Sequence, residues 1–553
     1  MSDCLSMDQT RISVLALKMF VPLCSRDARI RGQALEFLDC GFKSWSNGRP
    51  PVHVTSKFHL KHGDPEDEKM LSALTLKDCL PFLLMLAYQC PFNDVREKLF
   101  GILHMLRMCH VNVPSSLSSG PSSFIPLDEA ILPSTDNKKQ THDLFVDAFL
   151  QNNRLDHITQ LMGFHPQYLD PFLRTQNYIL KGDGPLPYDY RNYIAIMASA
   201  RHCCTHLVRL QKQEFLLQGG NKNWLNGLDW VPQKLQDLNE LNKILAHRPW
   251  LIKKSHIEKL TKGKDNWSLS EVVHAIVILA HFHCLSTFVF GCGISPEIDS
   301  SDGHTFQKSA ATSNNLSAEN SWNSHEAADT EAGVELLMQK MKTISEQHEE
   351  ASQEEKLKCF QKEQSQSAEL ITANDNTPLP KSDILRYTDD PDFSYQDFAK
   401  RGEGSEIPTF RIQDYSWDDH GYSLLNRLYN DVGTILDEKF KITYDLTYYT
   451  MGFKNNVDTS TFRRAIWNYI QCMYGIRHDD YDYREVNELL EKPLKAYIKT
   501  LSCYPERTTK KDYDSVMREF KHSEKVHVNL MMLEARMQAE LLYALRAIMR
   551  YMT

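Results

Sequence analysis

The sequence lacks the short motifs of the common nucleotide-binding and hydrolytic enzymes. It contains no GxGxxG or GxxxxGK[ST] loop, no HExxH helix, no GxSxG turn and no CxxC pair. These motifs hold phosphate, metal or a nucleophile because they fix the necessary groups at one spacing. Their absence leaves nucleotide hydrolysis and serine hydrolysis unsupported, and the sequence predicts no cofactor and no metal.

The chain also has little excess charge. Its 72 acidic residues outnumber 63 basic residues and give a net charge of −9. This mild imbalance provides no electrostatic attraction to a phosphate backbone, so no nucleic-acid partner is expected. With 553 residues, 42% of them hydrophobic, the chain is long enough for two or more folded cores.

The cysteines and the apolar stretches indicate in which cellular compartment the protein is expected. The 13 cysteines are odd in number and have no repeated spacing, which is typical of reduced thiols in the cytosol or nucleus. Acidic rather than basic residues precede the first apolar stretch, so no signal peptide is expected. Residues 272–291 are long enough to span a membrane but contain three histidines, so we expect a buried helix and no membrane insertion.

Apolar residues recur at helical intervals, and no convincing two-residue alternation appears, which predicts an all-α protein. Residues 1–120 are predicted to be a partly helical N-terminal extension containing a helical hairpin, followed by a first helical lobe at 121–294 and a second at 383–553. Between the lobes, residues 295–382 are rich in Ser, Glu, Asn and Gln, which predicts a disordered linker. One island in the linker, around Val334 and Met341, keeps helical spacing and is either a docked helix or a transient solvated one.

Two adjacent cysteines lie between histidines in ARHCCTHL, residues 200–207. A nearby histidine can lower the pKa of a thiol and activate it as a nucleophile. If the segment is helical, Cys203 and His206 share one face because they are three residues apart. The alternatives are buried structural cysteines in a packed helix and a zinc site that adds His281, His283 and Cys284, although no CxxC spacing supports zinc.

Two further segments of the C-terminal lobe have functional residue types. Arg463 can bind an α-carboxylate and Glu524 an α-ammonium, beside the TYYT segment at 447–450; the alternative is solvated residues on amphipathic helices. The loop RHDDYDY, residues 477–483, combines tyrosines that can supply contact area with acids that can attract a basic partner. An ordinary solvated loop is the alternative for this segment.

Long blocks of the chain resemble the sestrins, from GPSSFIPLDEAI at Gly120 to the terminal ALRAIMRYMT. The blocks include FHPQYLDPFLRTQNYIL, YRNYIAIMASARH, LNKILAHRPWLI, YSWDDHGYSLLNRLY, DTSTFRRAIWNYI, RHDDYDY and FKHSEKVHVNL. The segment before about Gly120 is assigned to no family. The resemblance implies two similarly folded helical lobes related to the AhpD-like fold.

For the cysteine cluster, the resemblance implies that Cys204 is the residue assigned to reduction of peroxides or of overoxidised peroxiredoxin. The family has a tyrosine two residues later and a histidine seven residues later, where this chain has His206 and Gln211. Glutamine cannot relay a proton, whereas His206 partly substitutes, as in AhpD-type reductases. Leu207 replaces their second cysteine. The resemblance therefore implies at most a weak thiol reductase and favours a protein that is not primarily an enzyme.

For the C-terminal lobe, the resemblance implies a leucine site in which Glu524 holds the ammonium and Arg463 the carboxylate. The threonine-rich lid of the family matches Thr447, Tyr448, Thr450 and Thr459. Met517 replaces a tryptophan of the pocket wall, and Phe462 stands where a leucine is usual. Because methionine is more adaptable than tryptophan, we expect a recess of different shape.

The resemblance also implies a partner. Asp479 and Asp480 match the aspartate pair with which sestrins bind the second GATOR subcomplex, and Ser268 lies where another contact residue is found. The leading hypothesis is a leucine sensor of the cytoplasm, and also of the nucleus, that binds this subcomplex when leucine is scarce and so restrains the TOR kinase. The alternatives are a weak thiol reductase and a ligand-independent GATOR-binding scaffold.

Overall fold

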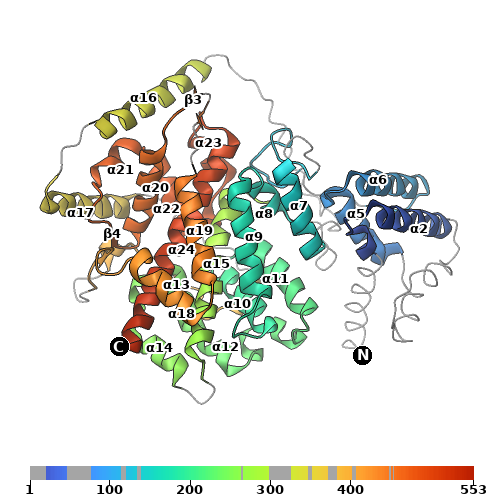
Figure 1. Ribbon diagram of the computed structural model, residues 1–553, viewed down its shortest axis with the longest axis horizontal. Helices are drawn as coiled ribbons and strands as arrows, with labels where there is room; N and C mark the ends of the chain where they lie inside the picture. Colours follow the sequence, from blue (N-terminus) through green and yellow to red (C-terminus); the bar gives the residue numbers. More distant parts are fainter. Residues whose placement is uncertain are drawn as a thin grey trace. The chain divides into compact units, whose positions relative to one another are not determined.

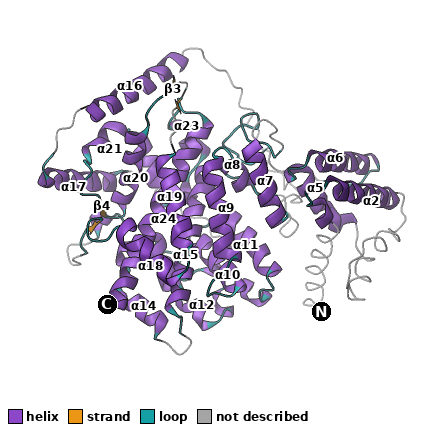
Figure 2. Cartoon of the chain, in the orientation of Figure 1, coloured by secondary structure: helices purple, strands orange, loops and turns teal. Residues whose placement is uncertain are grey.

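The computed structural model describes residues 20–46, 76–113, 120–133, 139–262, 266–297, 326–346, 351–370, 383–401, 407–446, 450–452 and 454–553. Contacts divide the chain into two compact units. The first unit comprises Met1–Leu169 with Ile294–Ala318, and the second comprises Asp170–Gly293 with Glu319–Thr553. Regular structure in both is almost entirely helical, which confirms the predicted all-α class (Figure 2).

The first unit contains the predicted N-terminal hairpin. Its helices are η1 (Val21–Leu23), α2 (Ala28–Ser46), α5 (Leu76–Gln89), α6 (Asn93–Met108), α7 (Lys139–Asn152) and α8 (His157–Met162). α5 and α6 pack together as consecutive helices. The apolar stripe of α6, formed by Leu99, Ile102, Leu103 and Leu106, is buried, so helical periodicity identified its inner face correctly.

The second unit holds most of the helices, from both predicted lobes, and begins within α9. The helices are α9 (Pro166–Lys181), α10 (Tyr188–Arg201), α11 (Thr205–Leu217), η2 (Lys222–Asn226), η3 (Leu228–Trp230), α12 (Gln233–Asp237), α13 (Asn239–His247), η4 (Pro249–Leu251), α14 (Lys254–Thr261), α15 (Leu269–Gly291), α16 (Glu326–Glu346), α17 (Gln353–Glu369), η5 (Asp383–Tyr387), η6 (Phe398–Lys400), η7 (Trp417–Gly421), α18 (Tyr422–Leu428), α19 (Val432–Asp445), α20 (Ser460–Met473), α21 (Arg484–Leu489), α22 (Lys492–Cys503), η8 (Pro505–Arg507), α23 (Lys510–Ser515) and α24 (His522–Met552).

α15 and α24 run side by side through the core of the second unit (Figure 1). α15 begins with a capping box in which Ser268 and Glu271 each accept a backbone N–H of the other. It is the one helix in the described part of the chain that is long and apolar enough to cross a membrane, and its apolar window is entirely buried. The predicted buried helix at 272–291 is therefore confirmed.

Two helices lie in the segment that was predicted to be a disordered linker. α16 buries Val334 and Met341, the apolar island of the sequence. α17 buries Phe360 together with Glu363, whose carboxylate accepts a hydrogen bond from the Lys495 ammonium at 2.9 Å. Average composition did not reveal these helices, because a few apolar residues and a paired charge offset an otherwise polar sequence.

Four two-residue strands place loops of the second unit. β1 (Phe410–Arg411) pairs in parallel with β4 (Ile476–Arg477), which leads into the RHDDYDY loop. β2 (Thr450–Met451) pairs antiparallel with β3 (Lys454–Asn455). Gly452 joins the latter pair with φ of +62°, a left-handed conformation that favours glycine.

Candidate functional site

Arg463 and Glu524 both lie in the first turn of a helix in the second unit. Arg463 belongs to α20, whose start is stabilised by the Asp458 carboxylate accepting from the Ser460 N–H at 2.9 Å. Arg463 is only 4% exposed, and its guanidinium donates to the Thr459 hydroxyl at 3.1 Å and to the Tyr444 carbonyl. A buried charge of this kind is costly unless it is compensated.

Glu524 is the third residue of α24 and is 6% exposed. Its Oε2 accepts two backbone N–H groups, those of Lys521 and Gly452, each at 2.9 Å. The first bond caps the helix, and the second fixes the β2–β3 hairpin to the helix start. Its Oε1 is buried and has no hydrogen-bond partner among the described residues, so it is an acceptor for an N–H group that this part of the chain does not supply.

His527 is a site residue that sequence reasoning missed. It follows Glu524 by three residues on α24, and these positions share a helix face. Burial lowers the pKa of His527 to about 4, and the nearby Arg463 cation contributes to the lowering. The hydrogen bond to the Thr443 carbonyl at 3.3 Å acts in the opposite direction and raises the pKa. His527 is therefore neutral, and it lies near enough to the Arg463 cation for that charge to lower its pKa. Its spacing from Glu524 was the available signal.

Phe462 and Met517 line the same cavity of about 280 Å³. Phe462 also contacts Phe520 edge-on, with ring centroids 5.8 Å apart. Neither Arg463 nor Glu524 is among the lining residues. The structure thus brings the two predicted wall residues together at one recess.

The predicted lid is only partly described. Thr447 and Tyr448 lie outside the described residues. Thr450 is half-buried in β2, and Thr459 is buried beneath Arg463. The hairpin that carries Thr450 is held by Glu524 through Gly452, so one end of the lid is attached to a predicted ligand-binding residue.

The aspartate pair of the RHDDYDY loop divides into one buried and one exposed residue. Asp479 is buried, paired with Arg477 and 3.5 Å from the Arg411 guanidinium of β1. The Asp480 side chain is 77% exposed, and one oxygen accepts from Arg464 at 2.8 Å. Asp480 is thus accessible to a partner, whereas Asp479 stabilises the loop.

The tyrosines of this loop and Ser268 differ in exposure. Tyr481 and Tyr483 are buried against each other, with ring centroids 5.1 Å apart, so they do not supply exposed contact area. They are core residues, and Tyr483 also contacts Phe360 of α17 with ring centroids 4.9 Å apart. Ser268 is exposed, and its hydroxyl accepts the Glu271 N–H at 3.2 Å as the cap of α15.

The ARHCCTHL segment is a turn and not a continuous helix. α10 ends at Arg201 and α11 begins at Thr205, with Cys203 at φ of +51°. The interpretation that Cys203 and His206 share a helix face is therefore wrong, because the chain reverses between them. Periodicity does not register such a local reversal.

Cys204 precedes α11 and is 1% exposed. Burial raises the pKa of its thiol to about 12, and the Leu207 N–H and the Ser286 hydroxyl only partly oppose that effect. Gln211 is buried in α11, and His206 is half-buried. Since the thiolate is the reactive form, this environment suppresses nucleophilic chemistry.

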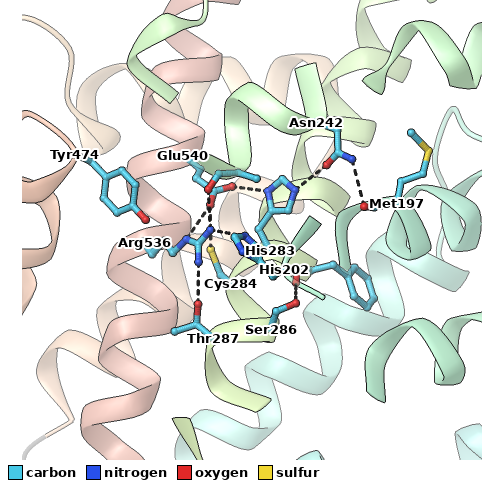
Figure 3. A network of polar contacts seen from close by, with 12 residues as sticks. Met197, His202, Asn242, His283, Cys284, Ser286, Thr287, Tyr474, Arg536 and Glu540 are labelled. Carbon is cyan, nitrogen blue, oxygen red and sulfur yellow. Dashed lines mark hydrogen bonds and ion pairs between the residues drawn. The ribbon is translucent and has the colours of Figure 1, made fainter. Parts of the chain in front are cut away.

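A second group of buried charges lies at the centre of the second unit (Figure 3). Arg536 of α24 donates to Glu540 at 3.1 Å, to Thr287 at 2.9 Å and to the ring of His202 at 2.7 Å. Glu540 also bonds His283 at 2.9 Å, whose other nitrogen lies 2.8 Å from the Asn242 amide. We call these residues the central network. Burial and the Arg536 cation hold the pKa of His202 well below its ordinary value, so its ring is a neutral acceptor.

Of the histidines of the zinc alternative, His202 and His283 lie together, with ring centroids 5.6 Å apart, and His281 lies elsewhere. His283 belongs to the central network, whereas His281 stacks on Phe172 with ring centroids 5.7 Å apart. The Cys284 thiol donates to Glu540 at 3.7 Å. Within the described ranges, no three His, Cys, Asp or Glu side chains are placed to hold one metal ion.

Known proteins match the chain over most of its length. The family model described as PA26 p53-induced protein (sestrin) matches residues 120–552. Sestrin-1 of Mus musculus is 54% identical over 485 residues, which cover 85% of this chain and 96% of the relative. Sestrin-2 of Homo sapiens is 50% identical over 442 residues, covering 78% and 91%. The Sestrin homolog of Drosophila melanogaster is 51% identical over 463 residues, covering 72% and 93%.

Proposed function

Because the chain belongs to the sestrin family, we propose that it senses a free amino acid, leucine or a close relative, and binds the second GATOR subcomplex when that amino acid is scarce. In this role it restrains TOR signalling in the cytosol, and the amino acid releases the partner. The proposal treats the protein as a regulator and not primarily as an enzyme.

The observation that carries the proposal is the buried Glu524 oxygen without a partner among the described residues. An α-ammonium group can donate to it, and the buried Arg463 guanidinium can donate to an α-carboxylate. Both groups are held by helix starts and backbone bonds, so the site is preorganised. A ligand that bridges them also acts on the hairpin that Glu524 holds.

Calorimetry of the full chain with leucine, methionine and isoleucine tests this proposal. We expect binding by the unmodified chain and a loss of at least tenfold in affinity for Glu524→Gln, because truncating one buried charge partner costs about 2–5 kcal/mol. Glutamine retains a carbonyl oxygen for the capping bonds. Glu271→Gln changes the same capping-box position on α15 and serves as the matched control. Absence of heat with all three amino acids rejects the sensor proposal.

The proposed binding of the second GATOR subcomplex is tested by capturing this subcomplex with the full chain, in the presence and absence of leucine. We expect capture to fall when leucine is added, and to fall in Asp480→Ala irrespective of leucine, since Asp480 is exposed. Capture that leucine does not change favours the ligand-independent scaffold. The burial of Cys204 and its raised pKa speak against the thiol-reductase alternative.

A further inference from the structure

The cavity beside Phe462 and Met517 has a wall that belongs to the predicted linker. α16 supplies it through residues that include Gly333, Val334 and Leu337. Val334 is buried, whereas Glu335 and Gln339 are exposed. The helix therefore presents an apolar side to the cavity and a polar side to solvent.

Three contacts hold α16 in this position. The Glu335 carboxylate pairs with the Lys454 ammonium of β3 at 3.1 Å. Gly333 lies so close to the loop after α23 that a Cβ there would approach Glu519 Oε1 to 2.8 Å. Val334 lies beside Gly452, with a methyl group 3.4 Å from the position of a Cβ on that glycine. Thus α16 contacts both the loop that carries Met517 and the hairpin that binds Glu524.

Met517 provides an independent sign of a built site. Its φ is +49°, a left-handed conformation that a residue with a side chain rarely adopts. Such conformations persist where the surroundings determine them, and they cluster at ligand sites. The side chain lines the cavity opposite α16, among charged residues of both signs that include Lys340, Glu491 and Arg518.

We propose that α16 is the outer wall of the side-chain recess of the amino-acid site, and that Val334 and Leu337 determine which apolar side chain is accepted. This inference rests on the proposed function. The cavity volume of about 280 Å³ is near the lower end of small-molecule sites, about 300 Å³, and leaves room for the apolar side chain of an amino acid. The segment between the predicted lobes is then a part of the binding site.

The test is calorimetry of the full chain with leucine, methionine and phenylalanine. Leu337→Trp fills the recess and is expected to weaken binding of all three at least tenfold, a typical effect of changed pocket volume. Leu337→Ala enlarges the recess and is expected to raise the affinity for phenylalanine relative to leucine. Gln339→Trp places the same bulk on the exposed side of α16 and is expected to leave all three affinities unchanged.

Hydrogen exchange of the unmodified chain tests the same inference without a substitution that could disturb folding. Added leucine is expected to slow exchange of the α16 amides in the unmodified chain, and this effect requires no substitution. If leucine binds and Glu524→Gln abolishes binding, but Leu337→Trp, Leu337→Ala and α16 exchange show no difference, the inference about α16 is wrong and the proposed function stands. If the unmodified chain binds none of the amino acids, both are wrong.

Discussion

The second unit buries an arginine and a glutamate in the central network and another arginine and glutamate at two helix starts, and the two sets differ in how completely their polar atoms are bonded. In the central network, Arg536 and both oxygens of Glu540 have hydrogen-bond partners within the chain. At the helix starts, Arg463 is bonded to the chain, but one oxygen of Glu524 has no described partner. Buried charges are tolerated when they are satisfied. The complete site is therefore structural, and the incomplete one is the candidate for a ligand.

The largest effect is expected in the central network. Glu540→Gln leaves the fully buried Arg536 without its counter-charge, and breaking a buried pair costs about 3–5 kcal/mol. Glu524→Gln is expected to cost less than about 1 kcal/mol, because the capping bonds remain. Denaturant unfolding of both variants measures the difference. Equal losses in the two variants contradict the assignment of one site as structural and the other as open.

The buried, neutral His527 beside the candidate ligand site is expected to make the stability of the fold depend on pH. Its folded pKa of about 4 lies below the ordinary value of 6.5, so the folded state holds fewer protons between these pH values. The stability contribution is present above pH 6.5 and is lost as pH falls toward 4, by up to about 3 kcal/mol. Unfolding of the unmodified chain and of His527→Gln at pH 7 and pH 4 isolates this contribution from those of other buried histidines. An unchanged pH dependence in the variant contradicts the buried neutral state.

The aspartates of the RHDDYDY loop differ in burial, since Asp479 is buried between two arginines and Asp480 is exposed. Asp479→Asn is expected to destabilise the fold by about 1–3 kcal/mol, because Arg477 and Arg411 lose a buried acceptor. Asp480→Asn is expected to change stability by less than about 1 kcal/mol, as for most exposed pairs. Thermal unfolding of both variants tests the contrast, and a larger loss for Asp480→Asn reverses it.

The smallest effect is expected at Cys204. With a thiol pKa of about 12, only about one molecule in ten thousand carries the thiolate at pH 8. Peroxide consumption by Cys204→Ser is expected to equal that of the unmodified chain. Alkylation followed by peptide mapping provides a second measurement, in which the exposed Cys40 and Cys109 react before Cys204. Rapid alkylation of Cys204 in the folded chain contradicts the buried state.

Periodic features of the sequence were predictable, and non-local ones were not. The helical stripe around Leu99 and the buried helix at 272–291 follow from spacing that every residue of an element shares. Arg463 and Glu524 were identified as candidates from residue chemistry and resemblance. The surroundings of these two residues could not be predicted, because His527 lies near Arg463 and Gly452 bonds Glu524 across long separations in the sequence. Likewise, no local signal distinguishes the buried Asp479 from the exposed Asp480.

The turn at Cys203 and the docked helix α17 show two further limits of sequence patterns. A single left-handed residue ends a helix without altering the hydrophobic spacing around it. α17 is polar on average, yet Glu363 is buried because Lys495, more than a hundred residues away, supplies its counter-charge. Pairing of this kind is a property of the fold and not of the segment.

Arg463 and Arg464 are consecutive residues of α20, and their side chains reach different surfaces. Arg463 bonds Thr459 in the candidate ligand site, whereas Arg464 holds the exposed Asp480 of the loop. One turn of helix is a stiff body about 10 Å across. Any shift of that turn would move both guanidinium groups together, so the buried site and the exposed loop share one structural support.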